Sequence, residues 1–128
     1  MIFLCLAAGK GSRFGHLGSY MQKCMYPIVL KPFVQFTLDG LVDAGVFDHE
    51  QDEFAFVVGH KAEQIRSYFG DEFRGIPIRY VEQGRALGTG HAVKTGFHAL
   101  GGHRSGSSVV AWLGDSYISG DILRQLAA

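Results

Sequence analysis

Short apolar runs alternate with amphipathic helical patterns along this sequence, and that alternation limits the folds open to it. The apolar runs lack interspersed polar residues, which is typical of strands that are buried on both faces. The runs predict strands, and the patterns between and after them predict helices. The predicted strands are residues 2–6, 54–58, 76–81 and 109–113, and the predicted helices are residues 33–44, 61–69, 88–100 and 121–126. Strands joined by helices form parallel sheets, so we expect an α/β fold: a Rossmann-like parallel β-sheet with helices on both faces.

The length of 128 residues fits a single domain, and the charge balance excludes several classes of partner. Lys and Arg together number 12, as do Asp and Glu, so the formal net charge is zero. We therefore expect no binding to a nucleic acid polymer or to a membrane surface. The two cysteines, Cys5 and Cys24, form no C-x-x-C motif. We expect both to be reduced in a cytoplasmic protein.

The long loop predicted at residues 7–26 is the first candidate for a ligand site. Ligands bind outside the carboxyl ends of the strands in parallel sheets, and this loop follows such an end. Glycines in Gly9-Lys10-Gly11 let backbone N–H groups approach a ligand, and Arg13 adds positive charge, so phosphate is the expected guest. The sequence has no P-loop motif, and Gly15 comes one position too late for a dinucleotide-binding G-x-G-x-x-G. From these residues alone, a plain surface turn is an equal alternative.

Four short elements follow one another along the chain. The first is Leu-Ala-Ala-Gly-Lys-Gly-Ser-Arg-Phe at residues 6–14, and the second comprises Lys23, Met25, Pro27, Ile28, Lys31 and Pro32. The third is Glu82-Gln83 followed by Leu-Gly-Thr-Gly-His-Ala at residues 87–92, and the fourth is Leu-Gly-Asp at residues 113–115. Together they resemble the pattern of the sugar nucleotidyltransferases, the nucleoside-diphosphate-sugar pyrophosphorylases. The third element, through His91-Ala92, is most similar to the N-acetylglucosamine-1-phosphate uridylyltransferases. The resemblance as a whole is closest to these enzymes and to the glucose-1-phosphate thymidylyltransferase type.

The resemblance implies transfer of a nucleoside monophosphate from a nucleoside triphosphate to a sugar 1-phosphate, with release of pyrophosphate. Catalysis of this kind is mostly positioning and charge neutralisation. Arg13 and Lys23 are the implied catalytic residues: Arg13 would clamp the triphosphate, and Lys23 would hold the sugar phosphate against it. Asp115 would bind Mg²⁺. The implied nucleotide-binding residues are Ala8, Gly9, Gly11, Ser12, Arg13, Gln83, Gly88 and Thr89, and Gln83 favours a pyrimidine base.

Two departures from the family pattern carry expectations of their own. Gln22 stands where the pattern has the proline before its lysine, and we expect a looser loop around Lys23. The chain is also shorter than the catalytic domains of the family. We therefore expect residues 1–128 to form the nucleotide-binding half of such a domain, apparently truncated. Apolar surface left exposed by a missing half would favour a homo-oligomer.

Simpler interpretations and other functions stay open beside the resemblance. Taken singly, Lys23 fits a solvated surface lysine, Asp115 a turn cap, and Gln83 an exposed strand end. Another function is a truncated nucleotide-binding or assembly module without turnover of its own. A choline-phosphate-type cytidylyltransferase of the same fold would change only the acceptor.

Overall fold

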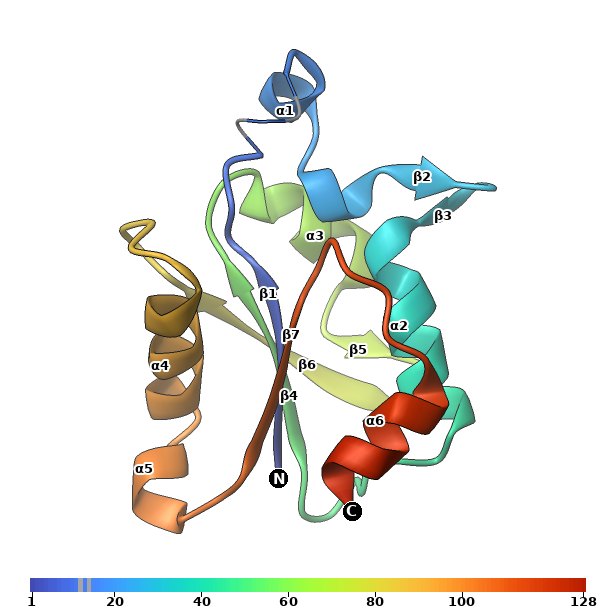
Figure 1. Ribbon diagram of the computed structural model, residues 1–128, viewed down its shortest axis with the longest axis vertical. Coiled ribbons are helices and arrows are strands. Elements are labelled where there is room, and N and C mark those ends of the chain that lie inside the picture. The colour runs from blue at the N-terminus through green and yellow to red at the C-terminus, as the bar shows by residue number, and fades with distance from the viewer. Residues whose placement is uncertain (12, 14) are drawn as a thin grey trace.

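A computed structural model describes residues 1–11, 13 and 15–128 of the chain. Among these residues a five-stranded sheet runs in the order β5–β6–β4–β1–β7 (Figure 1). Parallel pairing joins β1 (Ile2–Ala7), β4 (Glu53–Val58), β6 (Ile76–Glu82) and β7 (Val109–Leu113). At one edge, the short β5 (Glu72–Phe73) pairs antiparallel with β6. The parallel strands confirm the expected α/β fold.

Helices cover both faces of the sheet (Figure 1). One face packs against α2 (Phe33–Asp43), α3 (Ala62–Phe69) and α6 (Gly120–Ala127), and the other against α4 (Thr89–Ala99), which leads into the short α5 (Gly102–Ser105). Along β1, Phe3 and Cys5 belong to the first core, whereas Leu4 and Leu6 belong to the second. Because both faces are buried, the strand needs no polar alternation. No helix in the described part of the chain is long and apolar enough to cross a membrane.

Local sequence explains how several helices end and pack. The hydroxyl of Ser119 accepts a hydrogen bond from the N–H of Ile122 and so caps the start of α6. α3 ends at Gly70, whose φ of 63° suits glycine. α2 and α6 approach closely because both carry a glycine at their contact. A Cβ added to Gly120 would lie only 2.6 Å from the carbonyl oxygen of Gly40.

The strand order reverses beside β1. Strands β4 and β6 lie on one side of β1, whereas β7 returns to the other side. The N–H of Gly114 donates to the carbonyl of Leu6 at 2.8 Å, which continues the pairing of β1 with β7 past the end of β7. Ligands bind in the crevice at such a reversal, outside the carboxyl ends of the strands. The fold therefore directs attention to the ends of β1 and β7.

Several short elements occur where the sequence predicted only loops. The predicted loop at residues 7–26 contains α1 (Leu17–Tyr20) and η2 (Lys23–Met25), and the hairpin of β2 (Pro27–Ile28) and β3 (Lys31–Pro32) follows it. The hairpin turn has positive φ at Val29 (51°) and Leu30 (65°). Two-residue strands carry no periodicity, and a Val-Leu turn lacks the glycine or asparagine that normally marks such a turn.

Candidate active site

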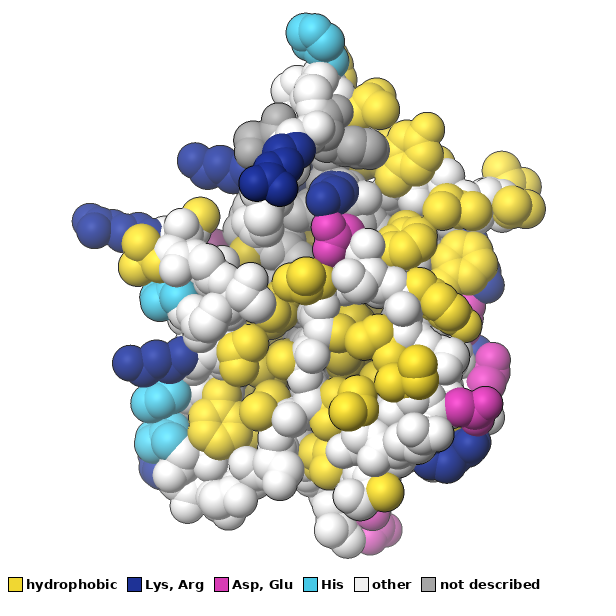
Figure 2. All heavy atoms as spheres, in the orientation of Figure 1, with side chains coloured by type: hydrophobic (Ala, Val, Ile, Leu, Met, Phe, Trp, Pro, Cys, Tyr) yellow, Lys and Arg dark blue, Asp and Glu magenta, His cyan; other side chains and the backbone are white. Residues whose placement is uncertain are grey.

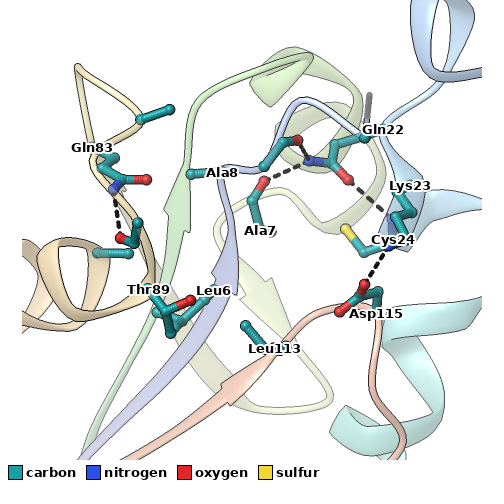
Figure 3. A pocket seen from close by; sticks show the side chains of 15 residues that line it. Leu6, Ala7, Ala8, Gln22, Lys23, Cys24, Gln83, Thr89, Leu113 and Asp115 are labelled. Atoms are coloured by element: carbon teal, nitrogen blue, oxygen red, sulfur yellow. Dashed lines mark hydrogen bonds and ion pairs between the residues drawn. The ribbon is translucent and has the colours of Figure 1, made fainter. Parts of the chain in front are cut away.

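A cavity of about 340 Å³ opens at the carboxyl ends of β1 and β7 (Figure 3). Its walls come from the loop after β1, from η2, from the segment between β6 and α4, and from the turn after β7. The cavity brings together predicted site residues from all four sequence elements: Ala8, Gly9, Gly11, Lys23, Gln83, Gly88, Thr89 and Asp115. The strand ends thus bring residues that are distant in sequence to one place.

The loop after β1 presents backbone donors to this region. Among the described residues, the N–H groups of Ala8, Gly9, Lys10 and Gly11 donate to no other protein group. A Cβ added to Gly9 would meet no atom within 4 Å, so the space beside it is open. Successive free N–H groups in a tight loop form an anion-binding nest. Unpaired N–H groups are donors that a phosphate site would need, and the phosphate site itself stays a prediction.

Lys23 and Asp115 form an ion pair in the cavity wall (Figure 3). The Nζ of Lys23 lies 2.6 Å from Oδ2 of Asp115. Gly114 allows this approach, because a Cβ there would lie 3.1 Å from the Cβ of Cys24. The side chains of Lys23 and Asp115 are 44% and 35% exposed, respectively. Partly exposed pairs contribute at most about 1 kcal/mol, so either side chain can turn toward a ligand at small cost.

Gln83 reaches from the end of β6 toward the start of α4 (Figure 3). Its backbone N–H donates to the carbonyl of Val58 at 2.9 Å, which holds it on the sheet. Its Nε2 donates to the carbonyl of Gly88 at 3.1 Å and lies 3.0 Å from Nδ1 of His91. Because the carbonyl of Gly88 must accept, Nε2 is the donor and His91 accepts through Nδ1. Among the residues that the structure describes, no group donates to the side-chain carbonyl oxygen of Gln83, so this oxygen can accept a hydrogen bond from a ligand.

The N-terminal end of α4 forms the same wall. Gly88 precedes the helix with a φ of 96°, a conformation that side-chain-bearing residues rarely adopt. Thr89, the first residue of α4, lines the cavity. The first N–H groups of a helix have no partner within it and carry partial positive charge. This end of α4 therefore favours an electronegative ligand group.

Gln22 is a site residue whose importance the sequence did not reveal. Its side chain is buried, with 2% exposed, between the loop after β1 and η2. Nε2 donates to the carbonyls of Ala7 at 2.7 Å and Gly9 at 3.0 Å, and Oε1 accepts from the N–H of Cys24 at 2.9 Å. The expectation of a looser loop was wrong, because these bonds fasten it. No local pattern could predict contacts between these separated segments.

Other predicted residues lie elsewhere. Arg13 is exposed and does not line the cavity, and Ser12 lies outside the described residues. Lys10 borders a second open cavity of about 460 Å³ together with His60 and Arg85. At the end of the molecule where β1 and β7 have their carboxyl ends, Figure 2 shows Lys and Arg side chains gathered around an acidic one. The triphosphate-binding role of Arg13 stays a prediction.

The titratable groups of the cavity limit its chemistry. Burial raises the pKa of Cys24 from 9.0 to about 12, so its thiol stays protonated near neutral pH and is a poor nucleophile. No group of three or more His, Cys, Asp or Glu side chains that could hold a metal ion occurs among the described residues. Asp115 could still hold Mg²⁺ as a single carboxylate, because Mg²⁺ commonly binds one or two carboxylates together with phosphates and water.

Known proteins resemble this chain in sequence and in fold. A UTP–glucose-1-phosphate uridylyltransferase, AglF of Haloferax volcanii, is 39% identical over 90 residues, which cover 70% of this chain and 35% of that protein. The D-glycero-alpha-D-manno-heptose 1-phosphate guanylyltransferase of Campylobacter jejuni is 37% identical over 91 residues, covering 71% of this chain and 39% of that protein. This chain thus spans well under half the length of either relative.

The structural comparison extends over nearly all of the chain. The crystal structure of a UDP-glucose pyrophosphorylase complexed with UDP-glucose matches with a TM-score of 0.77 and 26% identity, over 98% of this chain and 51% of that one. The family model described as nucleotidyl transferase matches residues 2–128. The resemblance carried by the four sequence elements is therefore confirmed, and the chain belongs to the nucleotidyl transferase family.

Proposed function

We propose that this chain forms the nucleotide-binding half of an enzyme that transfers a nucleoside monophosphate from a nucleoside triphosphate to a sugar 1-phosphate. The observation that carries the proposal is the meeting of three features in one cavity: the free N–H groups after β1, the Lys23–Asp115 pair and the Gln83 amide. One wall offers donors and a cation for phosphates, and the opposite wall offers an amide for a base. The relatives named above are, by name, a uridylyltransferase and a guanylyltransferase that act on sugar 1-phosphates.

The reaction requires two anions to meet. An oxygen of the sugar phosphate attacks the α-phosphorus in line, its bond to phosphorus forms, and pyrophosphate leaves with the electron pair of the broken bond. The ammonium of Lys23 would leave the carboxylate of Asp115 and bind phosphate oxygens instead. Its positive charge would then reduce the repulsion between the two anions. The planar guanidinium of Arg13 would bind the terminal phosphates and stabilise the charge on the leaving pyrophosphate.

Asp115 is the residue that would hold Mg²⁺. Its carboxylate lines the cavity, and among the described residues only Oδ2 of the two oxygens is engaged, by Lys23. A bound Mg²⁺ would supply charge neutralisation for the triphosphate. The donor set fits, because a hard cation prefers carboxylate and phosphate oxygens.

We propose a pyrimidine base as the favoured substrate. Within the described part of the chain the side-chain oxygen of Gln83 has no donor, and the N3–H of uracil or thymine is a matching one. The names of the two relatives cover both a uridylyltransferase and a guanylyltransferase. The identity of the base is therefore a question for binding measurements.

A second candidate is a nucleotide-binding module without turnover of its own. It is favoured by the coverage of the relatives, since the matched segment is 35% and 39% of their lengths. Such a module would bind the triphosphate at the same residues and would rely on further protein for the acceptor. A cytidylyltransferase of the same fold would be distinguished by a preference for CTP and for an alcohol phosphate.

Two further properties belong to the proposal. A cytoplasmic location is supported by two free, buried cysteines, since disulfides are typical of oxidising compartments. Self-association is supported by exposed apolar side chains, among them Val29 and Leu30 at the tip of the β2–β3 hairpin.

Titration calorimetry with UTP, dTTP, CTP, ATP and GTP, each with Mg²⁺, tests the binding claim. We expect UTP and dTTP to bind most tightly, and absence of binding to all five would reject the proposed function. A pyrophosphate-release assay with glucose 1-phosphate separates the two candidates. We expect this chain to release little pyrophosphate, and robust release would reject the module without turnover.

A further inference from the structure

Gln22 has a backbone conformation that is open to proline, the residue that the family pattern carries at its position. Its φ of −63° and ψ of 130° are values that a proline adopts without strain. Unlike proline, Gln22 has an N–H, and this group donates to Oε1 of Gln64 on α3 at 2.6 Å. Gln64 in turn donates its Nε2 to the carbonyl of Tyr20 at 2.7 Å. Gln22 is thereby tied to α3 by a bond that proline cannot form.

The side chain of Gln22 ties together the loop after β1 and η2. Figure 3 shows its amide between these two segments. Both hydrogens of Nε2 are directed to carbonyls, of Ala7 and of Gly9, and Oε1 accepts from the N–H of Cys24. A buried amide that uses its donors and its acceptor in this way has one favourable orientation.

These bonds set the direction of the donors after β1. In a trans peptide group the C=O and the following N–H point in opposite directions. Gln22 holds the carbonyls of Ala7 and Gly9, so the N–H groups of Ala8 and Lys10 point away from it. Both N–H groups are without a protein partner among the described residues. The amide thus turns carbonyl oxygens, which repel phosphate, away from the side on which the donors lie.

The same amide fixes the segment that carries Lys23. Gln22 caps η2 through its bond to the N–H of Cys24, and Lys23 is the residue between them. One side chain therefore sets both the loop donors and the start of the turn from which Lys23 reaches Asp115. Loss of the amide would free these two groups together.

We propose that Gln22 is a positioning residue, which holds the phosphate-binding loop and Lys23 in fixed relation through hydrogen bonds where the family pattern relies on a proline. The inference rests on the proposed function, because the geometry matters when both groups bind one substrate. Gln64 supports it by fixing the backbone of Gln22.

The first test is a double-mutant cycle between Gln22 and Lys23, measured by the Kd of UTP with Mg²⁺. Gln22→Met keeps the side-chain volume and removes the amide, and we expect binding about tenfold weaker. In a Lys23→Ala background Gln22→Met should weaken binding less than about threefold, because the lysine that Gln22 positions is already absent. Fully additive effects would overturn the proposal. Gln125→Met, at an exposed position of α6, is the matched control and should leave the Kd unchanged.

The second test needs no nucleotide and separates this inference from the proposed function. Amide ¹⁵N relaxation of the free chain should show lower order parameters at Gly9, Gly11 and Lys23 in Gln22→Met than in the wild type, with cooperative melting retained. Unchanged order at these residues would overturn the inference, whichever nucleotide binds. If Gln22→Met does not fold, Gln64→Met replaces it, since that change removes only the bond to the backbone of Gln22 and that to Tyr20. It should lower the order parameter of Lys23, and an unchanged value would count against the proposal.

Discussion

The carboxylate of Asp115 lies 2.6 Å from the ammonium of Lys23. The residue predicted to bind the metal is thus paired with the residue predicted to bind phosphate. Substrate binding would exchange this contact for two others: the lysine would turn to phosphate and the carboxylate to Mg²⁺. Because both side chains are partly exposed, separating them costs about 1 kcal/mol or less. We therefore expect metal and nucleotide to bind cooperatively.

Asp115→Asn should weaken the binding of UTP with Mg²⁺ by about tenfold or more, because the amide lacks the charge that Mg²⁺ requires. The free energy of unfolding should change by less than about 1 kcal/mol, since the lost ion pair is partly exposed. Calorimetry with and without Mg²⁺ measures the effect. Asp121→Asn, which removes the exposed partner of Arg124, is the control and should bind normally. An unaltered Mg²⁺ dependence in Asp115→Asn would exclude Asp115 as the ligand.

Gly88→Ala should weaken nucleotide binding, because its φ of 96° is strained for alanine by roughly 1–3 kcal/mol. Relief of that strain would displace the carbonyl that orients Gln83. Gly90→Ala is a matched control two residues on, where an added Cβ meets no atom within 4 Å and the helix continues. Gly90→Ala should stabilise the chain by up to about 1 kcal/mol. Equal binding by both variants would argue against the role of the Gly88 turn.

Arg13→Ala should weaken triphosphate binding about tenfold, because a guanidinium binds two phosphate oxygens at once. Thermal stability should be unchanged, as Arg13 is exposed. The comparison of UTP with UMP locates the effect: the loss should be large for UTP and small for UMP. Arg104→Ala, an exposed arginine of α5, serves as the control. A similar loss for both nucleotides would place Arg13 away from the terminal phosphates.

The chain should lose stability at alkaline pH. Burial raises the pKa of Cys24 from 9.0 to about 12 and also raises the pKa of Cys5 well above its usual value. The folded thiols keep protons that the unfolded chain releases, so the free energy of unfolding falls as pH rises above 9.0. The slope can reach about 1.4 kcal/mol per pH unit for each buried thiol. Denaturant titrations across this range measure it, and Cys24→Ala should show a shallower fall. An equal fall in both would assign the effect to other groups.

The sequence predicted the parts of the fold that depend on local patterns. The strand expected at residues 54–58 is Glu53–Val58, and the helix expected at residues 88–100 is Thr89–Ala99. Apolar runs without polar residues indicate strands that are buried on both faces, and amphipathic periodicity indicates helices. The antiparallel β5 was not predicted, because two residues carry no period and its register is set by pairing with β6.

The site was predictable only in part. Gln83 follows the end of β6, Asp115 follows the end of β7, and Lys23 comes after the loop that follows β1. Parallel strands end at one edge of the sheet, so the three residues line one cavity. The role of Gln22 depends on a hydrogen bond to Gln64, which lies outside the four sequence elements. The contact of His91 with the amide of Gln83 joins two parts of the third element that the sequence pattern does not pair. Such partners are set by packing, so Gln22 stood out in the sequence only as a departure from the family pattern.

The most direct test of the account is a two-dimensional ¹H–¹⁵N NMR titration of the chain with UTP and Mg²⁺. We predict saturable shifts at Gly9, Gly11, Gln83 and Gly88, and their loss in Lys23→Ala combined with Asp115→Asn. Absence of shifts, or shifts confined to α5 and α6 away from the cavity, would contradict the claim that this cavity binds a nucleoside triphosphate.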